Sequence, residues 1–221
     1  AYTDALLAKQ AQVSDALSAL GGTTLAHFTK LINGVAVEIS GAQARDLRAI
    51  PGVVSVSPLS NYELALDETV PWIGAADVQA MGFDGTGITV AVVDSGIDYT
   101  HAHLGGSGLQ ADTDQALAEA SQPADPRLFP SAKVIGGYDF VGSSWPNTPE
   151  IPDPNPMDDE AGLTDGHGTH VASIIGGVET DDLGPGVAPG VEFYALKVCS
   201  SVSTSCSGLA LLQAMEWAAD P

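Results

Sequence analysis

The first part of the chain carries a helical hydrophobic pattern followed by two strand-like runs. Apolar residues recur at helical spacing between positions 4 and 20, and Gly21-Gly22 is typical of a helix end. The strand-like runs cover 24–31 and 35–39, and Asn33-Gly34 between them is a strong hairpin signal. The residues on the apolar face of the helix are Leu6, Leu7, Val13, Leu17 and Leu20. We therefore expect a helix that packs on a two-stranded hairpin.

A second helix and a third strand are expected directly after the hairpin. Ser40 is a favourable N-cap for a short helix that reaches Ile50, and Pro51-Gly52 ends it. The β-branched run at 53–56 predicts the third strand. The order helix, strand, strand, helix, strand predicts a small α+β, ferredoxin-like domain over 1–58 that lacks its first strand.

The pattern changes after residue 58. Residues 59–71 show no strong period and predict an exposed connector to a second domain at 72–221. The apolar run at 88–93 predicts a strand buried on both faces. Residues 105–165 are rich in Pro, Gly and Asp, which predicts a long surface insertion that holds one strand within 132–141.

The remaining segments alternate between the hydrophobic pattern of a helix and that of a buried strand. Residues 170–178 predict a helix, 190–198 a strand and 208–219 another helix. Strands that alternate with helices predict an α/β domain with a doubly wound, mainly parallel sheet.

The charge of the chain excludes some classes of partner. The sequence has 28 acidic and 7 basic residues, a formal net charge of -21. Phosphate binding requires clusters of Lys and Arg, so neither nucleic acid nor an anionic lipid surface is an expected partner. The acidic surface is explained by solubility or by a saline or calcium-rich habitat, and the sequence leaves both readings open.

Two segments contain the residue types of acid–base chemistry. Asp94 follows the predicted strand at 88–93, at the sheet edge where open α/β domains place their active sites. His167 stands in Asp-Gly-His-Gly-Thr-His at the start of the predicted helix, where Asp165 or Thr164 can cap it. The helix dipole disfavours an imidazolium there and a nearby carboxylate favours it, a balance typical of a general base. Zinc is disfavoured because the histidine spacing differs from H-E-x-x-H.

Three blocks in this order, TVAVVDSGID, DGHGTHVASIIGG and GVAPGVEFYALKV, resemble the subtilisin-like serine proteases (subtilases, peptidase S8 family). The resemblance implies a secreted serine endopeptidase in which Asp94 orients the imidazole of His167, the general base. His170 is then expected to be a packed neighbour of the site. The block GVVSVSP resembles the end of the family's inhibitory propeptide, of the inhibitor I9 type, so 1–58 would be the protein's own inhibitor. Maturation would cleave the connector between Asn61 and Asp67.

The resemblance is incomplete in one respect. No G-T-S-M-A type block, which carries the family's nucleophile, occurs in the sequence. With the missing first strand, this predicts that the protein continues beyond this sequence at both ends. The spacing from Asp94 to His167 is closer to that of larger secreted subtilases. A non-catalytic pseudoprotease that acts as a binding module stays open, and a sedolisin-like acid protease is disfavoured because it uses Glu where His167 stands.

The sequence also leads to expectations for the two cysteines, for a group of cleft residues and for an acidic loop. Cys199 and Cys206 are either buried thiols or a disulfide across a short serine-rich loop, and the disulfide implies an oxidising compartment. By resemblance, Ser205, Ser207 and Gly208 form one wall of the cleft for polypeptide substrates. The chemistry requires no cofactor and we assign no metal ligands, but structural calcium stays open. The acidic loop that raises it contains Asp153, Asp158, Asp159, Glu160 and Asp165, whereas His103 stands where a compact subtilisin has a calcium ligand.

Overall fold

The computed structural model describes residues 2–60, 62–63, 73–159 and 166–221. Its contacts divide the chain into two units, Ala1–Ser60 with Met215–Pro221, and Asn61–Ala214. The segment Met215–Pro221 groups with the first unit because the carboxylate of Glu216 accepts hydrogen bonds from the backbone N–H groups of Thr29 and Lys30, at 2.5 and 2.7 Å. The expected domain bounds of 1–58, 59–71 and 72–221 stay predictions, and most of the connector lies outside the described residues.

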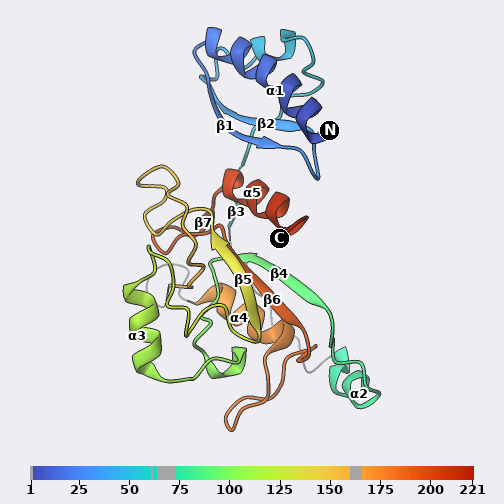
Figure 1. Cartoon of the computed structure of the whole chain (residues 1–221), viewed down its shortest axis with the longest axis vertical. Helices are drawn as coiled ribbons and strands as arrows, with labels where there is room; N and C mark the ends of the chain where they lie inside the picture. Colours follow the sequence, from blue (N-terminus) through green and yellow to red (C-terminus); the bar gives the residue numbers. More distant parts are fainter. Residues whose placement is uncertain (1, 61, 64–72, 160–165) are drawn as a thin grey trace. The chain divides into compact units, whose positions relative to one another are not determined.

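The first unit contains the expected helix and hairpin. Helix α1 covers Tyr2–Ala19, and strands β1 (Thr23–Phe28) and β2 (Gly34–Glu38) pair antiparallel (Figure 1). The helix ends as predicted: Gly21 takes a φ of 78°, and the N–H of Gly22 donates to the carbonyl of Leu17. The side chain of Leu17 is fully buried, and it packs with Leu47 and Ile50 in a small core.

Of the expectations for this unit, the second helix, the third strand and the burial of Leu7 are wrong. Only a 3-10 turn, η1 (Asp46–Ala49), forms in place of the predicted helix, and the hydroxyl of Ser40 donates to the side chain of Gln43 instead of capping a helix. Residues 53–56 form no strand, and Val54 is fully exposed. The sheet of β1 and β2 has no third strand within the described residues, so the ferredoxin-like arrangement is not confirmed. Leu7, predicted to face the core, is 41% exposed.

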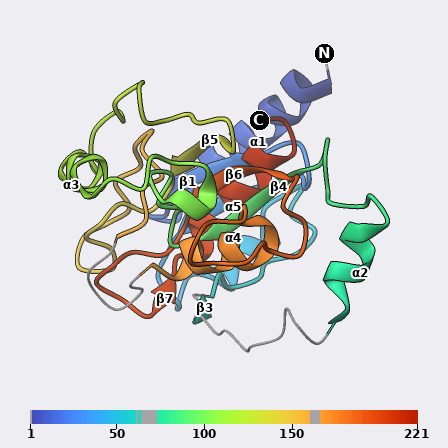
Figure 2. The ribbon, with the colours of Figure 1, turned by 90° about the horizontal axis from the view of Figure 1, so that it is seen from below.

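The second unit is built on a parallel sheet, as predicted. Strands β4 (Thr89–Asp94), β6 (Glu192–Lys197) and β5 (Val134–Asp139) lie side by side in that order, and both pairings are parallel. Helix α4 (His167–Gly176) packs against β4 (Figure 2). Parallel strands joined by long crossovers confirm an α/β fold, whereas the doubly wound arrangement stays a prediction.

The long insertion at 105–165 is more than a surface loop. It contains helix α3 (Gln110–Ala118) and strand β5, and it supplies buried side chains to the core. These buried residues are Phe129, Val134, Phe140, Val141, Trp145 and Met157. Sequence periodicity did not predict α3, because that helix is polar on most of its surface and buries only Thr113 and Ala116.

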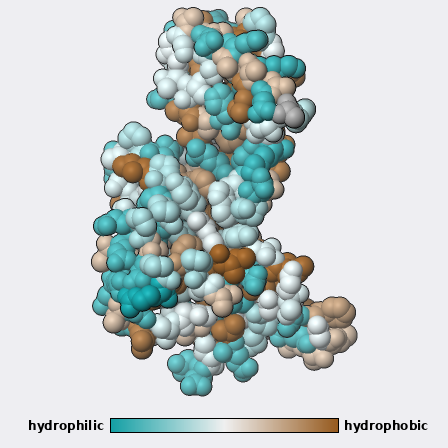
Figure 3. Space-filling view, viewed as in Figure 1, coloured by the Kyte–Doolittle hydropathy of each residue, from teal (hydrophilic) through white to brown (hydrophobic). Residues whose placement is uncertain are grey.

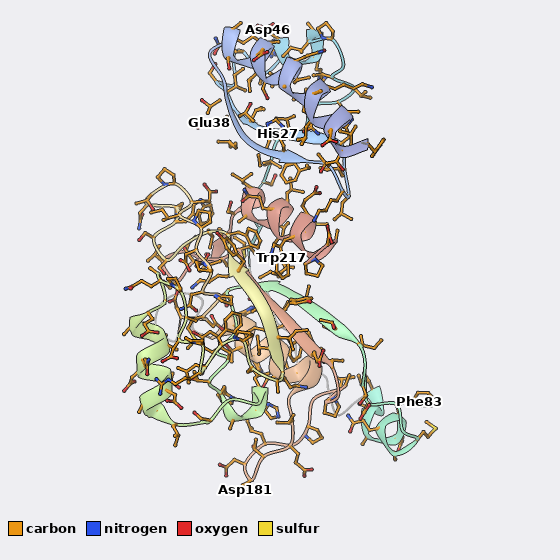
Figure 4. The ribbon with its side chains drawn as sticks, in the orientation of Figure 1. His27, Glu38, Asp46, Phe83, Asp181 and Trp217 are labelled. Carbon is orange, nitrogen blue, oxygen red and sulfur yellow. A yellow bond between two sulfur atoms is a disulfide. The ribbon has the colours of Figure 1, made fainter. Side chains whose placement is uncertain are left out.

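The remaining elements are short or lie toward the end of the chain. They are α2 (Ala75–Ala80), the 3-10 turn η3 (Ala102–Leu104), β3 (Tyr62–Glu63), β7 (Ser205–Cys206) and α5 (Gly208–Ala218). Apolar side chains are exposed around α2, where Figure 3 shows tan and brown surface and Figure 4 shows Phe83 directed outward. No helix within the described ranges is long and apolar enough to cross a membrane.

Candidate active site

Charged residues occupy the carboxyl edge of the parallel sheet. Asp94 is in register with Lys197, and Lys197 is in register with Asp139, so the last residues of β4, β6 and β5 stand side by side. All three are buried. Open α/β sheets place their active sites at this edge, and the sequence predicted that Asp94 lies there.

Asp94 and His167 form a hydrogen-bonded pair at this edge. Nδ1 of His167 donates to Oδ1 of Asp94 at 2.7 Å, and the two side chains are 16% and 12% exposed. The N–H of Ser95 donates to the same oxygen at 2.7 Å, which fixes the carboxylate. With the proton held on Nδ1, the other ring nitrogen, Nε2, is left to accept a proton, and it has no partner among the described residues.

Two glycines make this close approach possible. A Cβ on Gly168 would lie 2.2 Å from the carbonyl oxygen of Gly96 and 3.1 Å from Cβ of Asp94. Gly96 has a φ of 113°, and a Cβ there would lie 2.6 Å from the carbonyl oxygen of Pro156. The first turn of α4 therefore touches the loop after β4 directly, an approach that leaves no room for a side chain at Gly168 or Gly96.

The start of α4 is stabilised by distant side chains. Gly166 occupies the N-cap position in the left-handed conformation and supplies no side-chain hydrogen bond, while the predicted caps Thr164 and Asp165 lie outside the described residues. The N–H of Gly168 donates to the hydroxyl of Ser95 at 2.8 Å, and the N–H of Thr169 donates to Oδ2 of Asp158 at 2.9 Å. These bonds satisfy two of the N–H groups that a helix start leaves without a partner.

The expectation for His170 is wrong. Its side chain is exposed and does not pack beside the apolar stripe of α4. The stripe falls on Val171 and Ile175, which contact the core. In α4, therefore, the structure places His167 at Asp94 and turns His170 to solvent.

A buried ion pair adjoins the Asp94–His167 pair. Lys197 is fully buried, and its ammonium donates to Oδ2 of Asp159 at 2.9 Å and to the carbonyl of Met157 at 3.0 Å. The carboxylate of Asp139 lies 3.9 Å from the same ammonium, and its Oδ1 accepts from the N–H groups of Val141 and Gly142. Burial raises the pKa of Asp139 from 3.8 to about 6, against the opposing effect of the Lys197 charge and of these N–H groups.

This raised pKa predicts a stability that depends on pH. The folded state holds the proton of Asp139 more tightly than the unfolded chain, so the stabilisation is complete below about pH 4 and is lost as the pH rises through about 6. Chemical unfolding of Asp139→Asn and of the unchanged chain, measured from pH 4 to 7, should show the variant gaining on the order of 2–3 kcal/mol relative to the unchanged chain. The exposed Asp114→Asn should show no such trend, and a pH-independent difference for Asp139→Asn would contradict the assignment.

The acidic loop does not gather into a metal site within the described residues. Asp158 accepts a hydrogen bond from Thr169, and Asp159 accepts one from the ammonium of Lys197. Glu160 and Asp165 lie outside the described residues. No group of three or more His, Cys, Asp or Glu among the described residues is arranged to hold a metal ion. Asp153 instead serves the local backbone, because its Oδ1 accepts from the N–H of Asn155.

His103 holds the loop that follows α4. Its ring is buried, Nε2 donates to the carbonyl of Gly184 at 2.8 Å, and Nδ1 accepts from the hydroxyl of Ser173. The loop it clamps carries Asp181, which Figure 4 shows at an outer tip. His103 therefore joins α4 to the loop that follows it through hydrogen bonds.

The three residues predicted to line the substrate cleft differ in their surroundings. Ser205 lies in β7 and is half-buried. Ser207 is buried, its hydroxyl donates to Glu150 at 2.7 Å, and it accepts from the N–H of Ala210 in the first turn of α5. Gly208 is the buried first residue of α5. Ser207 is thus occupied as a helix cap, and Ser205 is the predicted residue with exposed surface.

Cys199 and Cys206 form a disulfide, the second of the two readings left open by the sequence. The same residues form an antiparallel backbone bridge, and the N–H of Ser207 donates to the carbonyl of Val198. The bond ties β7 to the chain that leaves the carboxyl end of β6. It therefore positions β7 beside the edge that carries Asp94.

Sequence reasoning missed the residues that join the segments of Asp94 and His167. Ser95 and Thr169 are neighbours of the motif residues, and Asp158 was considered only as a metal ligand. Lys197 was not singled out, although a lysine in an apolar strand is a signal because a buried ammonium requires acidic partners.

Comparison with known proteins matches the chain to one protein family and to several proteases. Residues 85–221 match the Subtilase family. The chain is 31% identical over 201 residues to alkaline elastase YaB of Bacillus sp. (strain YaB), covering 89% of the chain and 41% of that protein. It is 26% identical over 211 residues to subtilisin E of Bacillus subtilis (strain 168), covering 94% and 44%. It is 25% identical over 189 residues to the minor extracellular protease Vpr of the same strain, covering 78% and 20%. The chain thus spans about two fifths of the length of the first two relatives.

Proposed function

Because the chain belongs to the subtilase family, we propose that the protein containing it is a secreted serine endopeptidase that hydrolyses peptide bonds through an acyl-enzyme. The observation that carries the proposal is the 2.7 Å hydrogen bond from His167 to Asp94 at the carboxyl edge of the sheet. A buried carboxylate that holds Nδ1 of an imidazole is the arrangement by which a triad sets its general base.

Each residue has a defined role in this reaction. Nε2 of His167 takes the proton of a serine hydroxyl, which is a weak nucleophile at its own pKa, and later gives that proton to the leaving amine. Asp94 keeps the ring in the required tautomer and stabilises the imidazolium. The serine would come from a G-T-S type block, which this sequence does not contain. No step of the chemistry needs a cofactor.

The substrate is proposed to bind as an extended strand along β7. Within the second unit, the backbone of Tyr62–Glu63 (β3) already pairs antiparallel with Ser205–Cys206, with Tyr62 opposite Cys206 and Glu63 opposite Ser205. A strand edge that accepts one extended segment can accept another, because main-chain hydrogen bonds make few demands on side chains. The pairing supports β7 as one wall of the cleft and the connector as its first occupant.

Residues 1–58 are proposed to act as a propeptide. The connector that follows them supplies the strand that pairs with β7, so it would block the proposed cleft until it is cleaved. Secretion is supported by the Cys199–Cys206 disulfide, which requires an oxidising compartment, and by one relative that is named an extracellular protease.

The function is tested with a serine-directed fluorophosphonate probe and a peptide substrate. We expect the full-length protein to be labelled at one serine and to hydrolyse the peptide, and the 221-residue chain to show neither. Full-length protein that folds, binds peptide and shows neither labelling nor hydrolysis would identify a pseudoprotease. Labelling of the 221-residue chain would locate a nucleophile within it.

Maturation gives a second test. The bond that is cut should lie between Asn61 and Asp67, a segment mostly outside the described residues, because exposed connectors between folded units are where proteolysis concentrates. N-terminal sequencing of the secreted mature protein should find a start in this interval. A start before Pro58 or after Trp72 would rule out the connector as the maturation site.

A further inference from the structure

Asp158 is a fully buried carboxyl that the proposed reaction does not use. Its Oδ2 accepts two hydrogen bonds from Thr169, from the backbone N–H at 2.9 Å and from the hydroxyl at 2.6 Å. Thr169 lies in the first turn of α4, two residues after His167. The carboxyl therefore sits at the positive end of α4, where a helix favours an acidic partner.

The residues around Asp158 connect this helix turn to the segment that follows Asp94. The hydroxyl of Thr169, which donates to Asp158, also accepts from the N–H of Asp98 at 2.8 Å. Ser95, beside Asp94, accepts from the N–H of Gly168 at 2.8 Å. The two catalytic segments are thus joined through buried polar groups as well as through the His167–Asp94 bond.

We infer that Asp158 is a positioning residue that fixes the distance and angle between Asp94 and His167 by holding Thr169 at the start of α4. The inference rests on the proposed function, because positioning matters only if His167 is the base. Asp158 makes no hydrogen bond to either member of the pair, so it acts through Thr169. Gly168 contacts Gly96 directly, so the first turn of α4 cannot shift without moving against the loop after β4. A shift of this turn would also move the imidazole of His167.

The burial and hydrogen bonds of the Asp158 carboxyl indicate which side chain can replace it. Burial raises the pKa of Asp158 from 3.8 to about 6, and the hydrogen bonds from Thr169 oppose the rise. Oδ1 has no partner in hydrogen-bonding geometry among the described residues. An asparagine can present its oxygen to Thr169 and its NH₂ group at the position of Oδ1, so it keeps the bonds that position the turn. An alanine loses them.

The experiment compares Asp158→Ala and Asp158→Asn in the full-length protein, with Asp114→Ala as an exposed control. We expect Asp158→Ala to lower kcat by about 30-fold or more with KM nearly unchanged, because a displacement of about 1 Å can cost about 100-fold. Asp158→Asn should retain at least about a third of the unchanged kcat, since the geometry rather than the charge is required. A folded Asp158→Ala with unchanged kcat would overturn the inference, as would an Asp158→Asn that loses as much as alanine.

A second pair of variants covers the case in which Asp158→Ala does not fold. Thr169→Ser keeps the hydroxyl that joins Asp158 to the N–H of Asp98, and Thr169→Val removes it, so kcat should fall for valine and be largely rescued by serine. Equal kcat for the two would overturn the inference.

A spectroscopic readout separates this inference from the proposed function. The downfield proton resonance of the His167 Nδ1–H reports the bond to Asp94, and it should weaken or shift in Asp158→Ala and persist in Asp158→Asn. If the unchanged full-length protein shows no hydrolysis, the proposed function fails while this resonance still tests the positioning. A resonance identical in all three proteins would contradict it.

Discussion

Replacing His167 by alanine in the full-length protein is expected to lower kcat on a peptide substrate by about a million-fold, the size of loss known for the catalytic histidine of subtilisin. The physical reason is that in the proposed reaction Nε2 of His167 takes the serine proton, and no other imidazole among the described residues is bonded to Asp94. Purified variant and unchanged protein are compared in a peptide hydrolysis assay. Because self-processing would stop as well, the variant should also accumulate with its propeptide attached.

His170→Ala is the matched control for this change. The side chain of His170 is exposed, and exposed substitutions usually change stability by less than about 0.5 kcal/mol. Its kcat should therefore stay close to that of the unchanged protein, and so should its unfolding midpoint. A folded but inactive His170→Ala, together with near-normal kcat in His167→Ala, would reverse the assignment of the base.

Asp94→Asn is expected to lower kcat by about ten-thousand-fold, as the same change does in another serine-protease triad. An asparagine lacks the negative charge that stabilises the imidazolium, and where its NH₂ group faces the ring, Nδ1 is left without a proton and Nε2 carries it in the wrong tautomer. The loss should appear in kcat at neutral pH with the protein folded, which circular dichroism checks.

The control for Asp94→Asn is Asp114→Asn, an exposed carboxyl on α3. It removes the same charge from the chain and should leave kcat unchanged. Retention of more than about a tenth of the activity by Asp94→Asn would show that the imidazole is oriented by another group.

Strong local patterns accounted for the framework of the fold. The strands at 89–94 and 192–197 and the helix at 167–176 were predicted close to their observed bounds because a buried strand and an amphipathic helix have distinct periods. The strand expected at 53–56 did not form, although three of its four residues are valine, because a strand also needs a partner. Helix α3 was missed for the opposite reason, since it forms with almost no apolar stripe.

For the candidate site too, the residues within short motifs could be predicted, whereas the contacts between distant segments could not. Asp94 and His167 could be found because each lies in a short motif. The bonds from Asp158 to Thr169 and from Ser95 to Gly168 join segments far apart in the chain, and no local pattern specifies them. His170 was placed on the wrong side because one position on a helix separates the packed stripe from the exposed face.

The strand order of the sheet has a consequence for how the protein is made. β6 is the last of the three strands in the sequence, yet it lies between β4 and β5, which pair with it and not with each other. A chain emerging from the ribosome therefore carries Asp94 for about a hundred residues of synthesis before the central strand that completes its surroundings exists. Non-local parallel pairing is slow to form, so the sheet edge that carries Asp94 and Lys197 is completed late, only after β6 has been synthesised.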